Sequence, residues 1–209
     1  MSEFKNIYIL GYSGHAYVVV ESALSNNHTI QGYFDTKANE DNPYRLTFCG
    51  NEKEVDLKAI VGDDYVFPTV GDNELRKKIS ETLEQYHFNQ FTIIDKSAKV
   101  SKTAKINVST YVSSGAIINA RAVIGKACVI NTAAIVEHEC IVGDFSHIAP
   151  GAVLLGNVKV GEESFIGANS VIKEGVSIGD HVIVGAGSVV IKDLPSHTTW
   201  VGNPARRIK

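Results

Sequence analysis

The sequence has few cysteines, no excess of positive charge and no long hydrophobic run. Its 209 residues include three cysteines and carry a formal net charge of −3. A slightly negative net charge gives no support for nucleic-acid binding, which needs clustered basic residues. The lack of eighteen consecutive apolar residues gives none for a membrane span. The length suffices for two modest domains.

The first residues and the cysteines favour a cytoplasmic protein. Met1 to Lys5 do not open the long apolar stretch of a signal peptide. Cys128 and Cys140 occupy small-residue positions of the repeat described next, so we expect both to fill the core. Cys49 lies in a polar stretch and has no obvious partner.

A repeat of six residues dominates the second half of the chain. The residue two places before each repeated aliphatic is small or β-branched, as at Ala116, Cys128 and Ser164. A period of six fits neither a helix nor a single alternating strand. It predicts a solenoid of short strands joined by tight turns. The repeated aliphatic residues are Ile94, Val100, Ile106, Val112, Ile118, Ile124, Ile130, Val136, Val142, Ile148, Leu154, Val160, Ile166, Ile172, Ile178, Val184 and Val190.

Three hexads per coil predict a triangular prism in which inward aliphatic side chains stack 18 residues apart, as Val100, Ile118 and Val136 do. At about 4.8 Å per coil, the repeat predicts a column roughly 25–30 Å long. Each buried aliphatic contributes about 1.5–3 kcal/mol, although chain entropy cancels most of it. Glycine often follows the aliphatic, as at Gly143, and we expect it there because the turn needs a positive φ.

The first ninety residues follow a different pattern. Residues 5–10, 29–34 and 65–70 are expected to form strands, residues 16–24 and 73–86 helices, and residues 36–57 a loop with short pieces. The helix over 73–86 opens with a capping residue. The alternation predicts a small α/β domain with a parallel sheet over residues 1–90, followed by the solenoid over 91–209.

The turn at residues 11–15 lies between the first strand and the first helix, where helix N-termini bind anions. The dinucleotide fingerprint needs glycines at 11, 13 and 16, and Ser13 and Ala16 stand at two of these places, so an NAD site is a weak interpretation. The backbone of Ser13, Gly14 and His15 could still hold a nucleotide-linked ligand, or the turn could be purely structural. Asp35, at the end of the second strand, suits a ribose or base hydroxyl or is a solvated acid.

The sharpest departure from the repeat lies at residues 135–140, where Glu137 replaces the usual glycine and His138 and Glu139 follow in a turn. Imidazole titrates near neutral pH and accepts a proton from a nucleophile, and an adjacent carboxylate orients the ring and raises its basicity. A solvated turn remains the alternative. His147 lies half a coil further on, so the two histidines could meet across a subunit boundary.

The spacing of histidines and cysteines does not suit zinc, and we expect no metal.

The repeat resembles the hexapeptide-repeat acyltransferases, whose fold is a left-handed parallel β-helix. Residues 11–15, 34–35, 70–76, 130–147 and 201–206 are similar to those of the N-acetyltransferases that act on UDP-4-amino-sugars in bacillosamine synthesis. Sialic acid O-acetyltransferases share much of this pattern. The resemblance therefore implies a small Rossmann-like domain that binds a nucleotide-sugar, a left-handed β-helix, and a homotrimer with acetyl-CoA bound along the prism between neighbours.

The resemblance also implies a role for each matched position. His138 is the general base and Glu139 raises its basicity. The remaining assignments are nucleotide-sugar contacts at Ser13, Gly14, His15, Asp35, Gly71 and Asn131, and acetyl-CoA contacts at His147, Gly156, Ala168 and Ala186.

Two departures bear on the nucleotide and the sugar. Tyr12 replaces a small residue of the turn, where it could narrow the nucleotide pocket or stack on the base, and Thr36 stands where the family often has a second acid.

We expect acetyl transfer to the 4-amino group of a UDP-sugar for bacterial surface glycan or glycoprotein synthesis, with dTDP- and GDP-sugars left open. The alternatives are O-acetylation of sialic acid or another sugar hydroxyl, and a prism that serves only as a scaffold.

Overall fold

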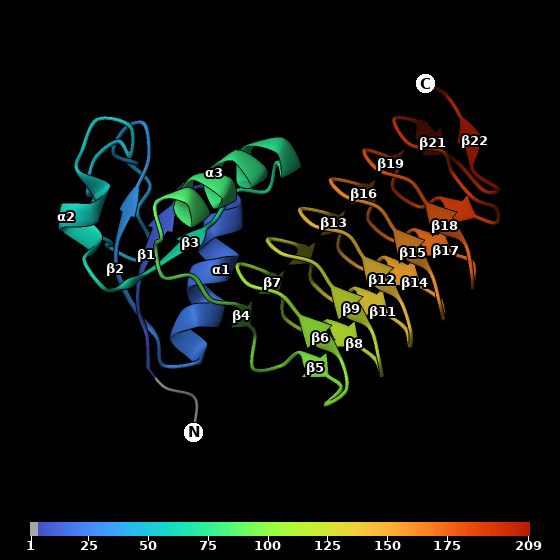
Figure 1. Cartoon of the computed structure of the whole chain (residues 1–209), viewed down its shortest axis with the longest axis horizontal. Helices are drawn as coiled ribbons and strands as arrows, with labels where there is room; N and C mark the ends of the chain where they lie inside the picture. The colour runs from blue at the N-terminus through green and yellow to red at the C-terminus, as the bar shows by residue number, and fades with distance from the viewer. Residues whose placement is uncertain (1–3) are drawn as a thin grey trace.

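The computed structural model describes residues 4–209 and shows a small α/β domain beside a long solenoid (Figure 1). In the domain, β1 (Asn6–Leu10) lies between β2 (Thr29–Phe34) and β3 (Tyr65–Pro68), and all three strands are parallel. The helices are α1 (Gly14–Ser25), α2 (Leu57–Val61) and α3 (Asn73–Gln85). The predicted parallel sheet is confirmed.

The two sides of β1 bury their residues against different helices, as expected for a strand covered on both faces. Ile7 and Ile9 pack in one cluster with Val19 of α1, whereas Leu10 packs in another with Leu83 of α3. The short helix α2 was not predicted. Its five residues are too few to show a helical period, and the carboxylate of Asp56 caps it by accepting from the backbone N–H of Ala59 (3.0 Å).

The solenoid is a triangular prism of short parallel strands, about six coils long and consistent with a left-handed β-helix. Face 1 contains β4 (Ile93–Ile94), β7 (Tyr111–Val112), β10 (Val129–Ile130), β13 (His147–Ile148), β16 (Phe165–Ile166), β19 (Ile183–Val184), β21 (Thr199–Val201) and the antiparallel β22 (Arg206–Arg207). Face 2 contains β5 (Lys99–Val100), β8 (Ile117–Ile118), β11 (Ile135–Val136), β14 (Val153–Leu154), β17 (Val171–Ile172) and β20 (Val189–Val190). Face 3 contains β6 (Lys105–Ile106), β9 (Val123–Ile124), β12 (Ile141–Val142), β15 (Lys159–Val160) and β18 (Ser177–Ile178).

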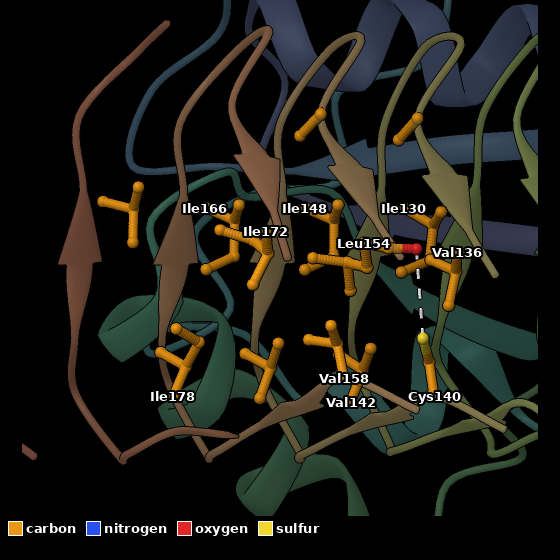
Figure 2. Close-up of a cluster of buried hydrophobic side chains, with 14 of the residues drawn as sticks. Ile130, Val136, Cys140, Val142, Ile148, Leu154, Val158, Ile166, Ile172 and Ile178 are labelled. Atoms are coloured by element: carbon orange, nitrogen blue, oxygen red, sulfur yellow. Dashed lines mark hydrogen bonds between the residues drawn. The ribbon is translucent and has the colours of Figure 1, made fainter. Parts of the chain in front are cut away.

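The repeated aliphatic residues form the core, as predicted. Figure 2 shows them pointing inward in stacks, with Val136, Leu154 and Ile172 in one of them. From Thr110 on, the small residues two places earlier are also buried, and several add a bond between coils. Ser164, for example, donates from its hydroxyl to the carbonyl of Gly179 (2.7 Å), and Cys128 donates from its thiol to Gly143 (3.1 Å). Both cysteines of the repeat are fully buried, as expected.

The reason given for the glycines that often follow the repeated aliphatic residues was wrong. Gly143 is not in the positive-φ region. A side chain there would collide with the next coil, because a Cβ would lie 2.7 Å from the backbone nitrogen of Glu162. The positive φ falls two residues later, every sixth residue from Ser109 (φ 59°) to Gly187 (φ 67°), and most of these residues are not glycine. Glycine is therefore needed for the close approach of coils and not for the turn.

The domain docks on the first coils of the solenoid, and the C-terminus lies at the far end (Figure 1). Helix α1 packs on face 1, where Tyr111 and Val129 join its hydrophobic cluster. Helix α3 follows the edge between faces 3 and 1, and Lys77 pairs there with Glu163 (2.5 Å). Across residues 4–209, no helix is long and apolar enough to cross a membrane.

Candidate active site

The predicted site residues fall into two separate groups on the solenoid and its domain. One group lies where the domain meets face 1 and the edge between faces 1 and 2. The other lies on the edge between faces 2 and 3. The strand β11 separates the two edges, since Asn131 precedes it and His138 follows it.

His147 is the centre of the first group. Its ring lies between the solenoid and the domain, with the residue only 8% exposed. Nε2 lies 3.0 Å from the amide nitrogen of Asn131, and Nδ1 lies 3.4 Å from the carbonyl oxygen of Gly71. Burial, with the Arg76 cation as the second cause, lowers the pKa of His147 from 6.5 to about 3. His147 is therefore a neutral imidazole held between the two parts of the chain.

His15, in the first turn of α1, packs beside His147 with ring centres 6.5 Å apart, and beside Tyr111 at 5.7 Å. Burial and the Arg76 cation lower the pKa of His15 to about 4. Its Nε2 atom is buried and has no hydrogen-bond partner among the described residues. A buried polar atom without a partner is costly, so a polar ligand group at this position would relieve the cost.

The turn that carries Ser13 and Gly14 lies beside Asp35, at the carboxyl ends of β1 and β2. The Asp35 carboxylate accepts from the backbone N–H groups of Tyr12 (2.9 Å) and Thr36 (2.7 Å). A cavity of about 390 Å³ opens next to it, bordered by Tyr12 and residues 35–40. A polar cavity at the carboxyl ends of parallel strands is a common ligand position in α/β folds.

Tyr12 itself is 1% exposed. Its ring stacks on Tyr33 with centres 4.2 Å apart, and its hydroxyl donates to the side chain of Asn42 (2.8 Å). These contacts hold the loop over residues 36–46 against the domain. Tyr12, which replaces a small residue of the family's turn, therefore packs mainly into the domain and lies at the edge of the cavity.

His138 and Glu139 form the second group, in the turn between β11 and β12. The His138 side chain is 59% exposed, and its Nδ1 atom lies 3.5 Å from Glu139 Oε2. The other Glu139 oxygen pairs with Arg121 Nη1 (2.9 Å), one coil earlier. Glu139 has a φ of 62°. The turn thus directs the imidazole outward and keeps the carboxylate beside it.

Gly156 lies one coil beyond His138 and supports its ring. A Cβ at Gly156 would lie 2.6 Å from Cε1 and 2.8 Å from Nε2 of His138. Glycine is therefore required for the ring to rest against the backbone of the next coil. Ala168 and Ala186 do not join this group, because they follow β16 and β19 on the edge between faces 1 and 2, where the N–H of Gly187 donates to Ala168 (2.8 Å).

A larger groove of about 710 Å³ begins at Gly71 and runs between the start of α3 and face 1. Phe165 and Ile183 form its solenoid side, and Phe165 also packs edge-on against His147 at 5.0 Å between ring centres. The groove therefore continues from the first group of predicted residues toward the distal coils.

Sequence reasoning missed two charged residues of the site. Arg121 lies 18 residues before Glu139, the length of one coil, so the repeat itself could have identified it. Arg76 is buried in the domain–solenoid junction, and no periodic signal marks it. Within residues 4–209, no group of three or more histidine, cysteine or acidic side chains could hold a metal ion.

Two segments of the chain match known families. Residues 6–83 match the PglD N-terminal domain, and residues 157–192 match the bacterial transferase hexapeptide (six repeats). Comparison with curated protein sequences gives no significant match.

Solved structures match the fold over nearly the whole chain. The acetyltransferase domain of PglB from Neisseria gonorrhoeae FA1090 is 30% identical, with 98% of this chain and 100% of that chain covered and a TM-score of 0.92. PerB from Caulobacter crescentus, in complex with CoA and GDP-perosamine, is 33% identical, with 99% of each chain covered and a TM-score of 0.91. WeeI from Acinetobacter baumannii AYE is 23% identical, with 97% and 99% covered and a TM-score of 0.85, and shows the fold alone.

The resemblance inferred from the sequence is therefore confirmed by identity over the full length and by the order of the two matched segments. This chain belongs to the hexapeptide-repeat acetyltransferases that carry a PglD-type N-terminal domain.

Proposed function

We propose that this protein transfers the acetyl group of acetyl-CoA to the 4-amino group of a nucleotide-linked amino-sugar, with a UDP-sugar favoured, for bacterial surface glycan or glycoprotein synthesis. Relatives at 29–33% identity have been solved with acetyl-CoA, or with CoA and GDP-perosamine, which supports both substrate classes. A cytoplasmic location remains the prediction made from the sequence.

One observation in this molecule carries the proposal: the two groups of predicted residues lie on the two edges that bound face 2. Asn131 and His147 belong to the edge between faces 1 and 2, and His138 to the edge between faces 2 and 3. Three prisms that turn face 2 toward a common three-fold axis would bring the second edge of one copy against the first edge of its neighbour. Each complete site would then combine His138 from one protomer with Asn131 and His147 from the next.

The outer surface of face 2 has the composition that such packing needs. After Lys99, its outward residues are all β-branched and aliphatic, and each is only half-buried: Ile117, Ile135, Val153, Val171 and Val189. Face 3 instead carries Lys105 and Lys159 among its outward residues. A continuous apolar column on one face supports a homotrimer that buries it.

The same arrangement supports a site for acetyl-CoA along the seam. Gly156 lies on the edge of His138, whereas Ala168 and Ala186 lie on the edge that would face it from the neighbouring copy. These three of the four predicted acetyl-CoA contacts would therefore line one groove between two protomers. Because glycine has no side chain and alanine only a methyl group, an extended cofactor could lie close to the backbone of the coils there.

His138 has the exposure and the partner that a general base needs. With Nδ1–H directed at Glu139, Nε2 carries the lone pair that would accept the proton of the sugar amine as its nitrogen attacks the thioester carbonyl. Glu139 would stabilise the imidazolium that forms. Positioning of both substrates between protomers would contribute alongside the base.

The nucleotide would occupy the cavity beside Asp35, with the sugar directed past the turn at Gly14 toward His15 and Asn131. The unpartnered Nε2 of His15 supports a polar sugar group at that point. Acetylation of an amine is favoured over the alternative on a hydroxyl, because the relatives that are 33% identical are named as perosamine N-acetyltransferases.

The test is acetyl transfer by the purified protein to UDP-, dTDP- and GDP-linked 4-amino-sugars. An amide product survives mild alkali, whereas an ester does not, and this distinguishes the amine from the hydroxyl. Light scattering should give three times the 22.6 kDa mass of the chain. The absence of turnover with every donor, together with no thermal shift on adding acetyl-CoA, would instead support the scaffold.

A further inference from the structure

Arg76, in the first turn of α3, is a buried cation at the junction of the domain and the solenoid. It is 1% exposed, and none of the described carboxylates forms an ion pair with it. Burial lowers its pKa to about 10, so it remains charged at neutral pH. A buried cation is expensive unless every donor is satisfied.

All five guanidinium N–H groups have an acceptor. Toward the solenoid, Nε donates to the carbonyl of Ala127 and Nη2 to that of Phe145, both at 2.7 Å. Toward the domain, Nη1 donates to the carbonyls of Val70 (3.1 Å) and Gly71 (2.9 Å), and Nη2 to the Asn73 side chain (2.8 Å). Lysine has only three donors on one atom and cannot reproduce this set.

The Gly71 carbonyl connects Arg76 to His147. A carbonyl oxygen only accepts, so the His147 nitrogen that faces it, Nδ1, must carry the hydrogen. Nε2 then holds the lone pair and accepts from the amide of Asn131. The opposite tautomer would place two acceptors together at Gly71 and two donors together at Asn131.

The amide of Asn131 is oriented at both ends. Its oxygen accepts from the backbone N–H of Thr132 (2.7 Å), and one of its two N–H bonds is used by His147. The second N–H is left to point away from His147 on the edge between faces 1 and 2. A protonated His147 would disrupt this arrangement, and burial, with the nearby Arg76 cation as the second cause, lowers the pKa of His147 and disfavours that form.

We propose that Arg76 is a positioning residue which, through the Gly71 carbonyl, holds His147 in the Nδ1–H tautomer and thereby directs the free N–H of Asn131 at the acceptor sugar. The proposal rests on the proposed function, because it takes Asn131 as a contact of the nucleotide-sugar. Arg76 touches neither substrate in this scheme and acts by fixing the groups that do.

The tautomer can be measured in the wild-type, full-length protein without any substrate. Nitrogen-15 spectra of histidine-labelled protein distinguish a protonated ring nitrogen from an unprotonated one, and the His147 signals are those lost in His147→Gln. We expect Nδ1–H with an unprotonated Nε2, unchanged from neutral pH to about pH 5. Finding the Nε2–H form, or an imidazolium at neutral pH, overturns the proposal whether or not the enzyme turns over a sugar.

Kinetics of Arg76→Lys test the consequence. This variant keeps the charge but loses the forked geometry, so we expect mixed His147 tautomers and a KM for the amino-sugar about tenfold higher, as for one lost oriented hydrogen bond. The KM for acetyl-CoA should rise clearly less than the KM for the amino-sugar, because only one of its four predicted contacts, His147, depends on Arg76.

The matched control is Lys126→Met, which removes the ion pair of Lys126 with Glu84 (2.9 Å) in the same docking interface without touching Gly71. It should leave both KM values and the His147 spectrum as in wild type. If Arg76→Lys and Lys126→Met raise both KM values to the same extent, the proposal is overturned and Arg76 only docks the domain. If Arg76→Lys does not fold, the wild-type spectrum still tests the His147 tautomer that the proposal requires.

Discussion

Acid should destabilise this protein through two histidines, His15 and His147, well above the pH at which carboxylates titrate. Folding buries both rings next to the Arg76 cation and lowers the pKa of His15 to about 4 and that of His147 to about 3. In the unfolded chain both regain an ordinary pKa near 6.5. The unfolded state therefore binds more protons than the folded state in the interval between these values.

The sign and size of the effect follow directly. Because folding lowers both pKa values, the full stability is present above about pH 6.5 and is lost as the pH falls toward the folded values. One pKa unit corresponds to about 1.4 kcal/mol, so moving from about pH 7.5 to pH 5 costs about 2 kcal/mol for each imidazole. The two together should remove about 4 kcal/mol from the free energy of unfolding, a large part of a typical domain's stability.

The assay is urea unfolding at both pH values at one fixed protein concentration, because the proposed assembly would make stability depend on concentration. His147→Gln removes one of the two groups and should lose only about 2 kcal/mol over the same interval. His87→Gln, at an exposed histidine after α3, should behave as wild type. An equal loss in wild type and His147→Gln would refute the reasoning that a buried neutral His147 causes the sensitivity.

Three further substitutions, the last with a matched control, test the site and the proposed assembly. His138→Ala should lower kcat by about a hundredfold with acetyl-CoA binding little changed, and near wild-type turnover would refute the assignment of the base. Gly156→Ala should lower kcat by about tenfold or more, since its Cβ would displace the His138 ring, and a crystal structure with an unmoved ring would contradict this. Val153→Lys on face 2 should weaken the proposed trimer in light scattering, whereas the control Ile141→Lys on face 3 should not.

The solenoid could be predicted from the sequence because its long-range contacts are periodic. Each residue meets the one 18 positions away, so arithmetic alone places Val136 on Leu154 and identifies the inward and outward residues of every coil. The same arithmetic accounts for Gly156 beneath His138 and could have identified Arg121 beside Glu139. The physical reason assigned to the repeated glycines was nevertheless wrong, since the spacing does not reveal whether a turn or a close approach requires them.

The first domain was predicted less completely. The strands and the two long helices have clear apolar patterns, and β2 begins and ends where the sequence indicated. The five residues of α2 carry no such pattern, and a local capping bond at Asp56 decides their structure. The resemblance supplied the candidate roles of the site residues, which no periodicity could assign.

By itself, the sequence determined the prism, its core and the outward position of His138, because one short repeat dictates all three. Only the tertiary structure decided which face the domain covers, and with it the burial of His147 and His15 and the partners of Arg76. The contacts between the two units join residues from 51 positions apart, as for Arg76 and Ala127, to 132 positions apart, as for His15 and His147. No local pattern encodes them, because they depend on how the surfaces of a helix and a solenoid edge fit together.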